Sequence, residues 1–519
     1  MDTIIVLDFG GQYCHLIARR VRDLGVYSEI LPHDVNIEKL HDILPKGIIL
    51  SGGPSSVYKK NSPQLPEGFL DFVKEHNIPV LGICYGLHLI IHEIGGKIQA
   101  YESKEYGKTQ LEIIKPGKLL DSLDSSETVW MSHGDQVLKM PEGFEALAKT
   151  ETCPVAAYGN DNLRLYGVQF HPEVVHTPKG KTILENFVFK IAECKKEWSL
   201  EDWITEKVEE IRNTVGTESR VILGLSGGVD SSVTAMLLHE AIGERLHCVF
   251  VNNGLLRKDE HIKVQRRFKD KLHFKNFLYV DAEELFLKRL MGVEDPEEKR
   301  KIIGHAFIEV FERKTIEIER DYPNIKFLAQ GTIYPDRVET ATTSKAAAKI
   351  KSHHNLTLPE GMKLEVIEPL EDLYKDEVRR IGFKLGLNKY LIERHPFPGP
   401  GLAVRCLGPI EKSKLDTLRD ADKILLEEIR KANIYEDLWQ VFCVLLPIKT
   451  VGVMGDYRTY EYICAIRAVE SLDAMTANFA KLDWNLLEKI GTRIINEVKG
   501  FNRVVYDISN KPPSTIEYE

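Results

Sequence analysis

The chain has 519 residues, which is too long for one ordinary hydrophobic core, so its length predicts two or three domains. Hydrophobic residues make up 43% of the sequence and charged residues 28%, as in ordinary globular proteins. The formal net charge of −9 argues against general nucleic-acid binding, and no apolar run approaches the roughly 20 residues that a membrane span needs. Charge and apolar runs together predict a protein that binds neither nucleic acid nor membrane. The eight cysteines are scattered without a C-x-x-C pair, which predicts reduced thiols and a cytoplasmic protein.

Residues 1–197 alternate short apolar runs with amphipathic stretches. The apolar runs predict strands at residues 3–9, 47–54, 79–86 and 165–174, and helical periodicity marks residues 12–25 and 87–96. This alternation predicts an α/β domain with a largely parallel sheet. A helix over residues 197–216, opened by Ser199 and Asp202 and closed by Gly216, is predicted to mark the domain boundary.

Residues 198–394 repeat the α/β pattern, whereas residues 395–519 do not. Further strands are predicted at residues 220–226, 246–254, 274–282 and 326–334, with helical stretches such as 258–272 between them. The run from Pro396 to Gly401 holds three prolines and two glycines, which forbids regular structure. A helix at 412–432 and strands at 441–448 and 461–469 then predict a smaller C-terminal α+β domain.

Cys84 stands between Gly82 and Gly86 in VLGICYGLHLI, where a predicted strand meets a predicted helix. The G-x-C-x-G spacing is the thiol counterpart of the G-x-S-x-G elbow, whose glycines allow a sharp bend that exposes the nucleophile. A helix N-terminus behind the thiol favours the reactive thiolate. A buried structural cysteine is the alternative interpretation.

A histidine and a glutamate two residues apart, His171 and Glu173 in VQFHPEV, favour the catalytic interpretation. On an extended segment both side chains point to the same face, so the histidine can take the thiol proton while the glutamate fixes its tautomer. The backbone of SGGP, residues 51–54, could supply an oxyanion hole. His133 in the polar segment MSHGDQV, predicted to be a loop, is an alternative base, although such a histidine is more often structural.

Together LGICYG, SGGP and FHPE resemble the class I (triad) glutamine amidotransferases, which hydrolyse glutamine through a cysteine thioester and release ammonia. The resemblance covers the first third of the chain. It implies that Cys84 is the nucleophile, His171 the base and Glu173 its orienter. It also implies that Gly53 and Tyr85 contribute backbone N–H groups to the oxyanion hole.

A second glycine-rich turn, LGLSGGVDSS, joins a predicted strand to a predicted helix over residues 223–232. Its backbone N–H groups form an anion site at a helix N-terminus, but the turn lacks the lysine of a Walker-type loop. Asp230 can hold Mg²⁺ that bridges phosphate oxygens. Without a lysine on the γ-phosphate, the turn favours retention of pyrophosphate while the α-phosphorus reacts. A glycine-rich turn without a ligand is the alternative.

SGGVDSS resembles the pyrophosphate loop of the N-type ATP pyrophosphatases, which have a Rossmann-like domain. These enzymes esterify an oxygen of their acceptor with AMP, which ammonia or another nucleophile then displaces. The resemblance implies that ATP is a co-substrate and that Mg²⁺ is held by Asp230. The implied ATP-binding residues are Ser226, Gly227, Gly228, Val229, Asp230, Ser231 and Ser232.

RHPFPGPGLAVR, LPIKTVGVMGDYRTYEY and NRVVYDISNKPPSTIEYE extend the resemblance over the whole chain, to the family of glutamine-hydrolysing GMP synthetases. In that family ATP adenylates O2 of XMP, and ammonia displaces AMP to give GMP. The resemblance implies a C-terminal domain that forms a homodimer and contacts XMP. The implied contacts are Arg257, Gln440, Lys511 and Glu517, although a solvated surface arginine is an equal alternative for Arg257.

The segment that contains IKSHHN corresponds in this family to a lid over ATP and XMP. Its implied contacts are Asp336, Glu339, Lys351, His353 and His354. The two adjacent histidines invite a metal interpretation, but no third ligand stands at a usable spacing, so zinc is not expected there. The chain departs from the family in ending IEYE rather than IEWE, and in an alanine-rich segment before Lys351.

Two other functions remain compatible with the sequence. One is an amidotransferase–pyrophosphatase enzyme that aminates another acceptor, such as deamido-NAD, and a tail without XMP contacts would favour it. The other is a non-catalytic nucleotide-binding protein built on the same domains. The intact set of Cys84, His171 and Glu173 argues against a pure binder, which has no use for an exposed elbow thiol.

Overall fold

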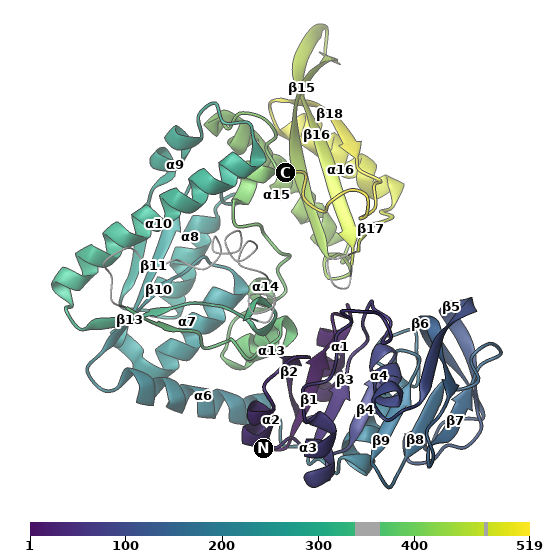
Figure 1. Ribbon diagram of the computed structural model, residues 1–519. Coiled ribbons are helices and arrows are strands. Elements are labelled where there is room, and N and C mark those ends of the chain that lie inside the picture. The colour runs from purple at the N-terminus through teal and green to yellow at the C-terminus, as the bar shows by residue number, and fades with distance from the viewer. Residues whose placement is uncertain (338–363, 472–475) are drawn as a thin grey trace. The chain divides into compact units, whose positions relative to one another are not determined.

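A computed structural model describes residues 1–337, 364–471 and 476–519. The chain divides into two compact units, Met1–Trp203 and Ile204–Glu519 (Figure 1). The division falls inside helix α6 (Leu200–Val215), the helix predicted at the domain boundary. The domain limits predicted at residues 197 and 394 stay predictions. Within the described residues, no helix is both long and apolar enough to cross a membrane.

The first unit is built on a nine-stranded sheet of order β2-β1-β3-β4-β9-β8-β7-β5-β6. Along this order, β2, β1, β3, β4 and β9 pair with their neighbours in parallel. The remaining pairs, from β9–β8 to β5–β6, are antiparallel. Every residue of β3, β4 and β9 is buried, as expected where parallel strands are covered on both faces. The strands are β1 (Thr3–Asp8), β2 (Tyr27–Pro32), β3 (Gly47–Leu50), β4 (Val80–Ile83), β5 (Lys97–Ile113), β6 (Ser126–Lys139), β7 (Glu145–Lys149), β8 (Ala157–Asn160) and β9 (Leu165–Val168).

The helices of the first unit follow the predicted alternation with strands. They are α1 (Cys14–Asp23), α2 (Ile37–Ile43), α3 (Phe69–Glu75), α4 (Tyr85–Glu93), α5 (Gly180–Glu185) and the π-helical η1 (Asn186–Ile191). The polar segment MSHGDQV was predicted to be a loop, and this prediction is wrong. It lies inside β6, where antiparallel pairing with β5 satisfies its backbone.

The second unit begins with a five-stranded, fully parallel sheet of order β12-β11-β10-β13-β14. The chain leaves β10 toward one edge and returns at β13 to build the other, so the strand order reverses between β10 and β13. In open α/β sheets ligands bind outside the carboxyl ends of the strands at such a reversal. The strands are β10 (Arg220–Gly224), β11 (Leu246–Asn252), β12 (Phe277–Asp281), β13 (Ile325–Ala329) and β14 (Glu365–Ile367).

Helices flank this parallel sheet, as the predicted α/β pattern requires (Figure 1). They are α7 (Val229–Ile242), η2 (Gly243–Arg245), α8 (Glu260–Gln265), η3 (Arg266–Lys271), α9 (Glu283–Leu290), α10 (Pro296–Asp321), α13 (Lys375–Lys384) and α14 (Lys389–Ile392). The helix predicted at 258–272 is therefore α8 continued by a π-helical turn, η3.

A mixed four-stranded sheet forms the C-terminal part of the second unit. The hairpin β15–β16 is antiparallel, β17 pairs with β16 antiparallel, and β18 pairs with β16 in parallel. Helices α15 and α16 pack against β15 and β18, and one hydrophobic core runs from the parallel sheet into this part. The elements are η4 (Gly401–Val404), α15 (Lys412–Lys431), β15 (Gln440–Met454), β16 (Tyr457–Glu470), β17 (Asn478–Phe479), α16 (Trp484–Glu497) and β18 (Phe501–Tyr506). An α/β part with a mixed sheet whose first half is parallel, an α/β part with a fully parallel sheet and a smaller α+β part confirm the predicted fold class at the level of successive α/β domains. The sheet of the first part is less parallel than predicted, because β5 to β8 add antiparallel pairs to it.

Candidate active sites

Cys84 occupies a sharp turn between β4 and α4. Its backbone has φ 53° and ψ −101°, a strained conformation for a residue with a side chain. A Cβ atom on Gly82 would lie 2.4 Å from the carbonyl carbon of Gly86, and one on Gly86 would lie 2.5 Å from the carbonyl oxygen of Leu50. Both glycines are therefore required by close backbone approach, and the predicted strand-to-helix elbow is present.

The histidine and glutamate predicted beside this thiol do meet. His171 Nδ1 lies 2.7 Å from Glu173 Oε1, and both side chains are buried. The two residues lie beyond the end of β9, in a turn rather than on the strand that was predicted. The hydroxyl of Thr177 donates to the carbonyl oxygen of His171 at 2.7 Å and holds this turn. The pairing is thus set by the turn and not by strand alternation.

The environment of His171 favours its protonated form. Burial is the largest single influence and lowers the pKa, but the Glu173 carboxylate and the Cys84 thiol together outweigh it and raise the pKa to about 10. The thiol of Cys84 also lies 3.7 Å from the carbonyl oxygen of Ser132 and from Nε2 of Gln169. This arrangement can hold an imidazolium against a thiolate.

The backbone segment of Gly52 and Gly53 borders the elbow. A Cβ atom on Gly52 would lie 3.3 Å from Cε1 of His171 and 3.8 Å from Cβ of Cys84. A Cβ atom on Gly53 would lie 3.3 Å from Cγ of Tyr85. The two predicted oxyanion donors, Gly53 and Tyr85, are therefore neighbours beside Cys84.

The ring nitrogens of His133, the alternative base, contact groups other than the Cys84 thiol. Its Nε2 lies 3.0 Å from Oε2 of Glu105, and its Nδ1 lies 3.0 Å from the carbonyl oxygen of Asp135. Both ring nitrogens are engaged, so His133 does not compete with His171 for the thiol proton.

The second glycine-rich turn follows β10 and opens α7, at the reversal of strand order. Gly227 has φ +77°, and its carbonyl oxygen accepts from Arg394 at 3.0 Å. Ser226 and Ser231 are joined through their hydroxyls at 2.8 Å, and Ser232 donates to the carbonyl oxygen of Gly228 at 2.6 Å. The start of α7, Val229, thus presents backbone N–H groups at a helix N-terminus, which suits an anion.

The sequence did not reveal that a lysine reaches this turn. Lys375, at the start of α13, forms an ion pair with Oδ2 of Asp230. Oδ1 of Asp230 is buried and finds no hydrogen-bond partner in the described part of the chain. No sequence signal links two residues so far apart, because a motif registers only neighbours along the chain.

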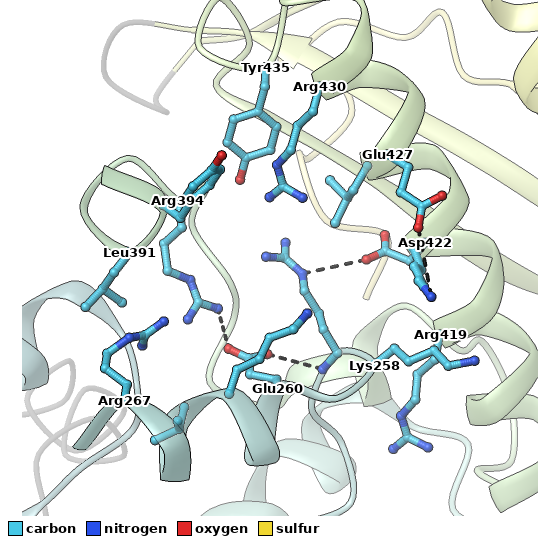
Figure 2. A pocket seen from close by; sticks show the side chains of 16 residues that line it. Lys258, Glu260, Arg267, Leu391, Arg394, Arg419, Asp422, Glu427, Arg430 and Tyr435 are labelled. Carbon is cyan, nitrogen blue, oxygen red and sulfur yellow. Dashed lines mark hydrogen bonds and ion pairs between the residues drawn. The ribbon is translucent and has the colours of Figure 1, made fainter. Parts of the chain in front are cut away.

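A basic pocket of about 380 Å³ lies between α8 and α15 in the second unit (Figure 2). Arg257 is one of its lining residues, and its Nε lies 3.7 Å from Asp422. Burial, the largest influence, lowers the pKa of Arg257, and Asp422 opposes that effect. Among the described residues Nη2 of Arg257 has no hydrogen-bond partner. Arg257 is thus not the solvated surface arginine that the sequence left open.

Basic side chains outnumber acidic ones around this pocket. The charged lining residues are Arg257, Lys258, Glu260, Lys263, Arg267, Arg394, Arg419, Asp422, Lys423, Glu427 and Arg430. Figure 2 shows Arg394 reaching Glu260, with which it pairs at 2.7 Å. The surplus of positive charge suits an anionic ligand.

The C-terminal tail is fixed to the body of the second unit. Glu517 accepts two hydrogen bonds from the buried Arg405, at 2.7 and 3.0 Å, and one from Gln440 at 2.7 Å. Lys299 forms an ion pair with Glu519. The backbone of Lys511 bridges to residue 477. Gln440 and Glu517 are therefore brought together.

Of the predicted lid residues, only Asp336 lies within the described part of the chain. Its Oδ2 accepts from the backbone N–H of Ile333 at 3.3 Å. Glu339, Lys351, His353 and His354 lie outside the described residues.

Three family models match successive parts of the chain. Class I glutamine amidotransferase matches residues 5–191, NAD synthase matches 198–288, and the GMP synthase C-terminal domain matches 427–518. Relatives named GMP synthase (glutamine-hydrolyzing) align over essentially their full length. The chain is 54% identical over 520 residues to that of Carboxydothermus hydrogenoformans, covering 100% of both chains. It is 53% identical over 517 residues to that of Aquifex aeolicus, covering 99% of each.

Proposed function

The chain belongs to the family of glutamine-hydrolysing GMP synthases, and from that premise we propose how its residues carry out the glutamine-dependent amination of XMP to GMP. ATP is the co-substrate, and it is cleaved to AMP and pyrophosphate as XMP is adenylated. The observation that supports a working glutaminase most directly is the contact between His171 and Glu173 beside the strained elbow of Cys84.

Glutamine is hydrolysed in the first unit. The Cys84 thiolate attacks the side-chain amide carbon, and the backbone N–H groups of Gly53 and Tyr85 stabilise the oxyanion. The imidazolium of His171 donates its proton to the departing ammonia. His171 then accepts a proton from the water that hydrolyses the thioester, while Glu173 keeps the ring oriented.

XMP is adenylated in the second unit. The backbone N–H groups of Gly228 and the following residues hold the pyrophosphate of ATP, assisted by the hydroxyls of Ser226, Ser231 and Ser232. Lys375 supplies the positive charge that the turn itself lacks. When Lys375 turns from Asp230 to the phosphates, both carboxylate oxygens of Asp230 become available to a cation.

Mg²⁺ fits at Asp230. Oδ1, which has no partner within the described part of the chain, and the ion-paired Oδ2 would offer the hard oxygen ligands that this cation takes. Bound Mg²⁺ would neutralise charge on the phosphates of ATP. Asp230 holds that position, and Lys375 would turn to the phosphates.

XMP is held by residues of the basic pocket and of the tail. Arg257 provides a buried guanidinium whose Nη2 has no hydrogen-bond partner among the described residues and can bind an anionic oxygen. Gln440, Lys511 and Glu517 contact the nucleotide from the C-terminal part, and Glu517 is oriented by Arg405. Asp336, with Glu339, Lys351, His353 and His354, contributes the lid contacts.

The C-terminal part forms a homodimer through the hairpin β15–β16. This hairpin exposes five large apolar side chains, and exposed apolar surface of this kind marks interaction sites. They are Ile448, Val451, Val453, Tyr457 and Tyr460. A charged substitution such as Val453→Glu is expected to halve the mass measured by light scattering.

The eight unpaired cysteines support a cytoplasmic location.

The decisive experiment compares nitrogen sources. Cys84→Ala is expected to abolish GMP formation from glutamine and to leave GMP formation from ammonium unchanged. Equal loss of both activities would mean that Cys84 is structural. Turnover of deamido-NAD in place of XMP, measured by pyrophosphate release, would instead support an enzyme that aminates another acceptor.

A further inference from the structure

A buried cluster in the first unit, separate from the triad, contains three side chains of the kinds that bind transition metals. Glu105 on β5, His133 on β6 and Cys153 between β7 and β8 bring one ligand atom each to within 4.8 Å of the others. Their exposed fractions are 9%, 5% and 1%. Among the residues that the structure describes, this is the one group of three or more such side chains that meets so closely.

The hydrogen bonds around His133 leave a position for a cation. Nδ1 faces the carbonyl oxygen of Asp135, which can only accept, so Nδ1 carries a proton. Nε2 then faces Oε2 of Glu105 at 3.0 Å. A lone pair and a carboxylate oxygen repel at that distance unless a second imidazole proton or a metal ion lies at the junction. The thiol of Cys153 lies within 4.8 Å of both atoms and offers a metal ion a third ligand.

Further hydrogen bonds hold each of the three residues in place. Oε1 of Glu105 accepts from the hydroxyls of Thr150, at 2.6 Å, and of Thr152, which leaves Oε2 for the junction. The proton on Nδ1 of His133 is held by a backbone carbonyl, and the backbone N–H of Cys153 donates to Thr150 at 3.0 Å. Outer hydrogen bonds of this type orient the ligands of metal sites.

We propose that Glu105, His133 and Cys153 bind a divalent transition metal of the zinc class. Sulfur and imidazole nitrogen together select Zn²⁺ over Mg²⁺ or Ca²⁺, which prefer oxygen. With metal–ligand bonds of about 2.0–2.3 Å, tetrahedral Zn²⁺ separates its ligand atoms by roughly 3.2–3.6 Å. The ligand atoms of the cluster lie within 4.8 Å of one another, so the most distant pair needs to approach by up to about 1.2–1.6 Å. Binding displaces the thiol proton of Cys153 to solvent. Three protein ligands leave one position for a small ligand such as water.

The metal would act as a positioning element for the glutaminase site. Ser132 adjoins His133 on β6, and its carbonyl oxygen lies 3.7 Å from the thiol of Cys84. A metal that joins β5, β6 and the turn at Cys153 therefore fixes the strand segment that borders the nucleophile.

Titration of the full chain with Co²⁺, after removal of bound metal, tests this proposal. The expected result is one Co²⁺ per chain, with a sulfur-to-cobalt charge-transfer band that Zn²⁺ displaces. Cys153→Ser removes the band. The matched controls Cys84→Ser and Cys194→Ser retain it, because these thiols lie outside the cluster. Thr152→Val, which removes an outer hydrogen bond, retains the band and weakens Zn²⁺ binding about 10- to 100-fold.

Two results would overturn the proposal. One is the absence of the band in the unmodified protein. The other is a band that survives Cys153→Ser and disappears in Cys84→Ser, which places the metal on the catalytic thiol. If Cys153→Ser fails to fold by circular dichroism, Glu105→Gln gives the same test through loss of Zn²⁺ affinity. None of these outcomes depends on XMP or ATP turnover.

Discussion

Glu173→Gln removes the charge that holds His171 protonated while preserving the size of the side chain. The pKa of His171 is raised from 6.5 to about 10 against the effect of burial, and at about 1.4 kcal/mol per pH unit this favours the imidazolium by roughly 5 kcal/mol. Without the carboxylate, only the Cys84 thiol opposes the effect of burial, so the pKa of His171 falls and fewer molecules carry the imidazolium at neutral pH. Glutaminase kcat/KM is expected to fall about 10²- to 10⁴-fold.

The assay is glutamate release measured across pH, with ammonium-driven GMP formation measured in parallel. In the unmodified protein the imidazolium stabilises the site fully below pH 6.5 and is lost as the pH rises through about 10, so the alkaline limb lies near that value. In Glu173→Gln the limb moves to lower pH. Glu185→Gln, at a partly buried position that loses only a 3.7 Å contact to Lys181, is the matched control. A full glutaminase rate in Glu173→Gln, or an equal loss of the ammonium reaction, would refute the electrostatic argument.

Three other predictions rest on the remaining contacts. Asp230→Asn should stop AMP release with glutamine and with ammonium alike, and a normal rate with either would contradict the assigned role. Gly86→Ala should lower the free energy of unfolding in urea by about 1–3 kcal/mol, because its Cβ meets the backbone of β3, whereas Gly134→Ala meets only a flexible side chain and should be nearly neutral. Glu517→Gln should lower the free energy of unfolding by about 3 kcal/mol, because Arg405 stays buried without its charge partner. The same change should increase hydrogen exchange in the tail and raise the KM for XMP. Unchanged hydrogen exchange in the tail would contradict this prediction.

The strands β3, β4 and β9 could be predicted from the sequence because buried parallel strands are continuous apolar runs. Strands β5 and β6 could not, because they carry many exposed polar residues and depend on pairing with each other. The spacing of His171 and Glu173 predicted their contact correctly, although the reason given, an extended strand, was wrong.

The contacts that the sequence did not reveal all join residues remote along the chain. Lys375 meets Asp230, and Arg405 meets Glu517, through the packing of separate helices and strands. Residues 338–363, which hold most of the predicted lid, lie outside the described residues.

The sequence by itself determined the family, the two reaction centres and the order of the parts, because glycine-rich turns and short catalytic motifs are local and their chemistry depends on neighbouring residues. Only the tertiary structure decided which charges neutralise one another, that a lysine faces the pyrophosphate turn, and that Glu105, His133 and Cys153 meet. Electrostatic and coordination contacts act across a few ångströms of space, and distance along the chain does not encode them.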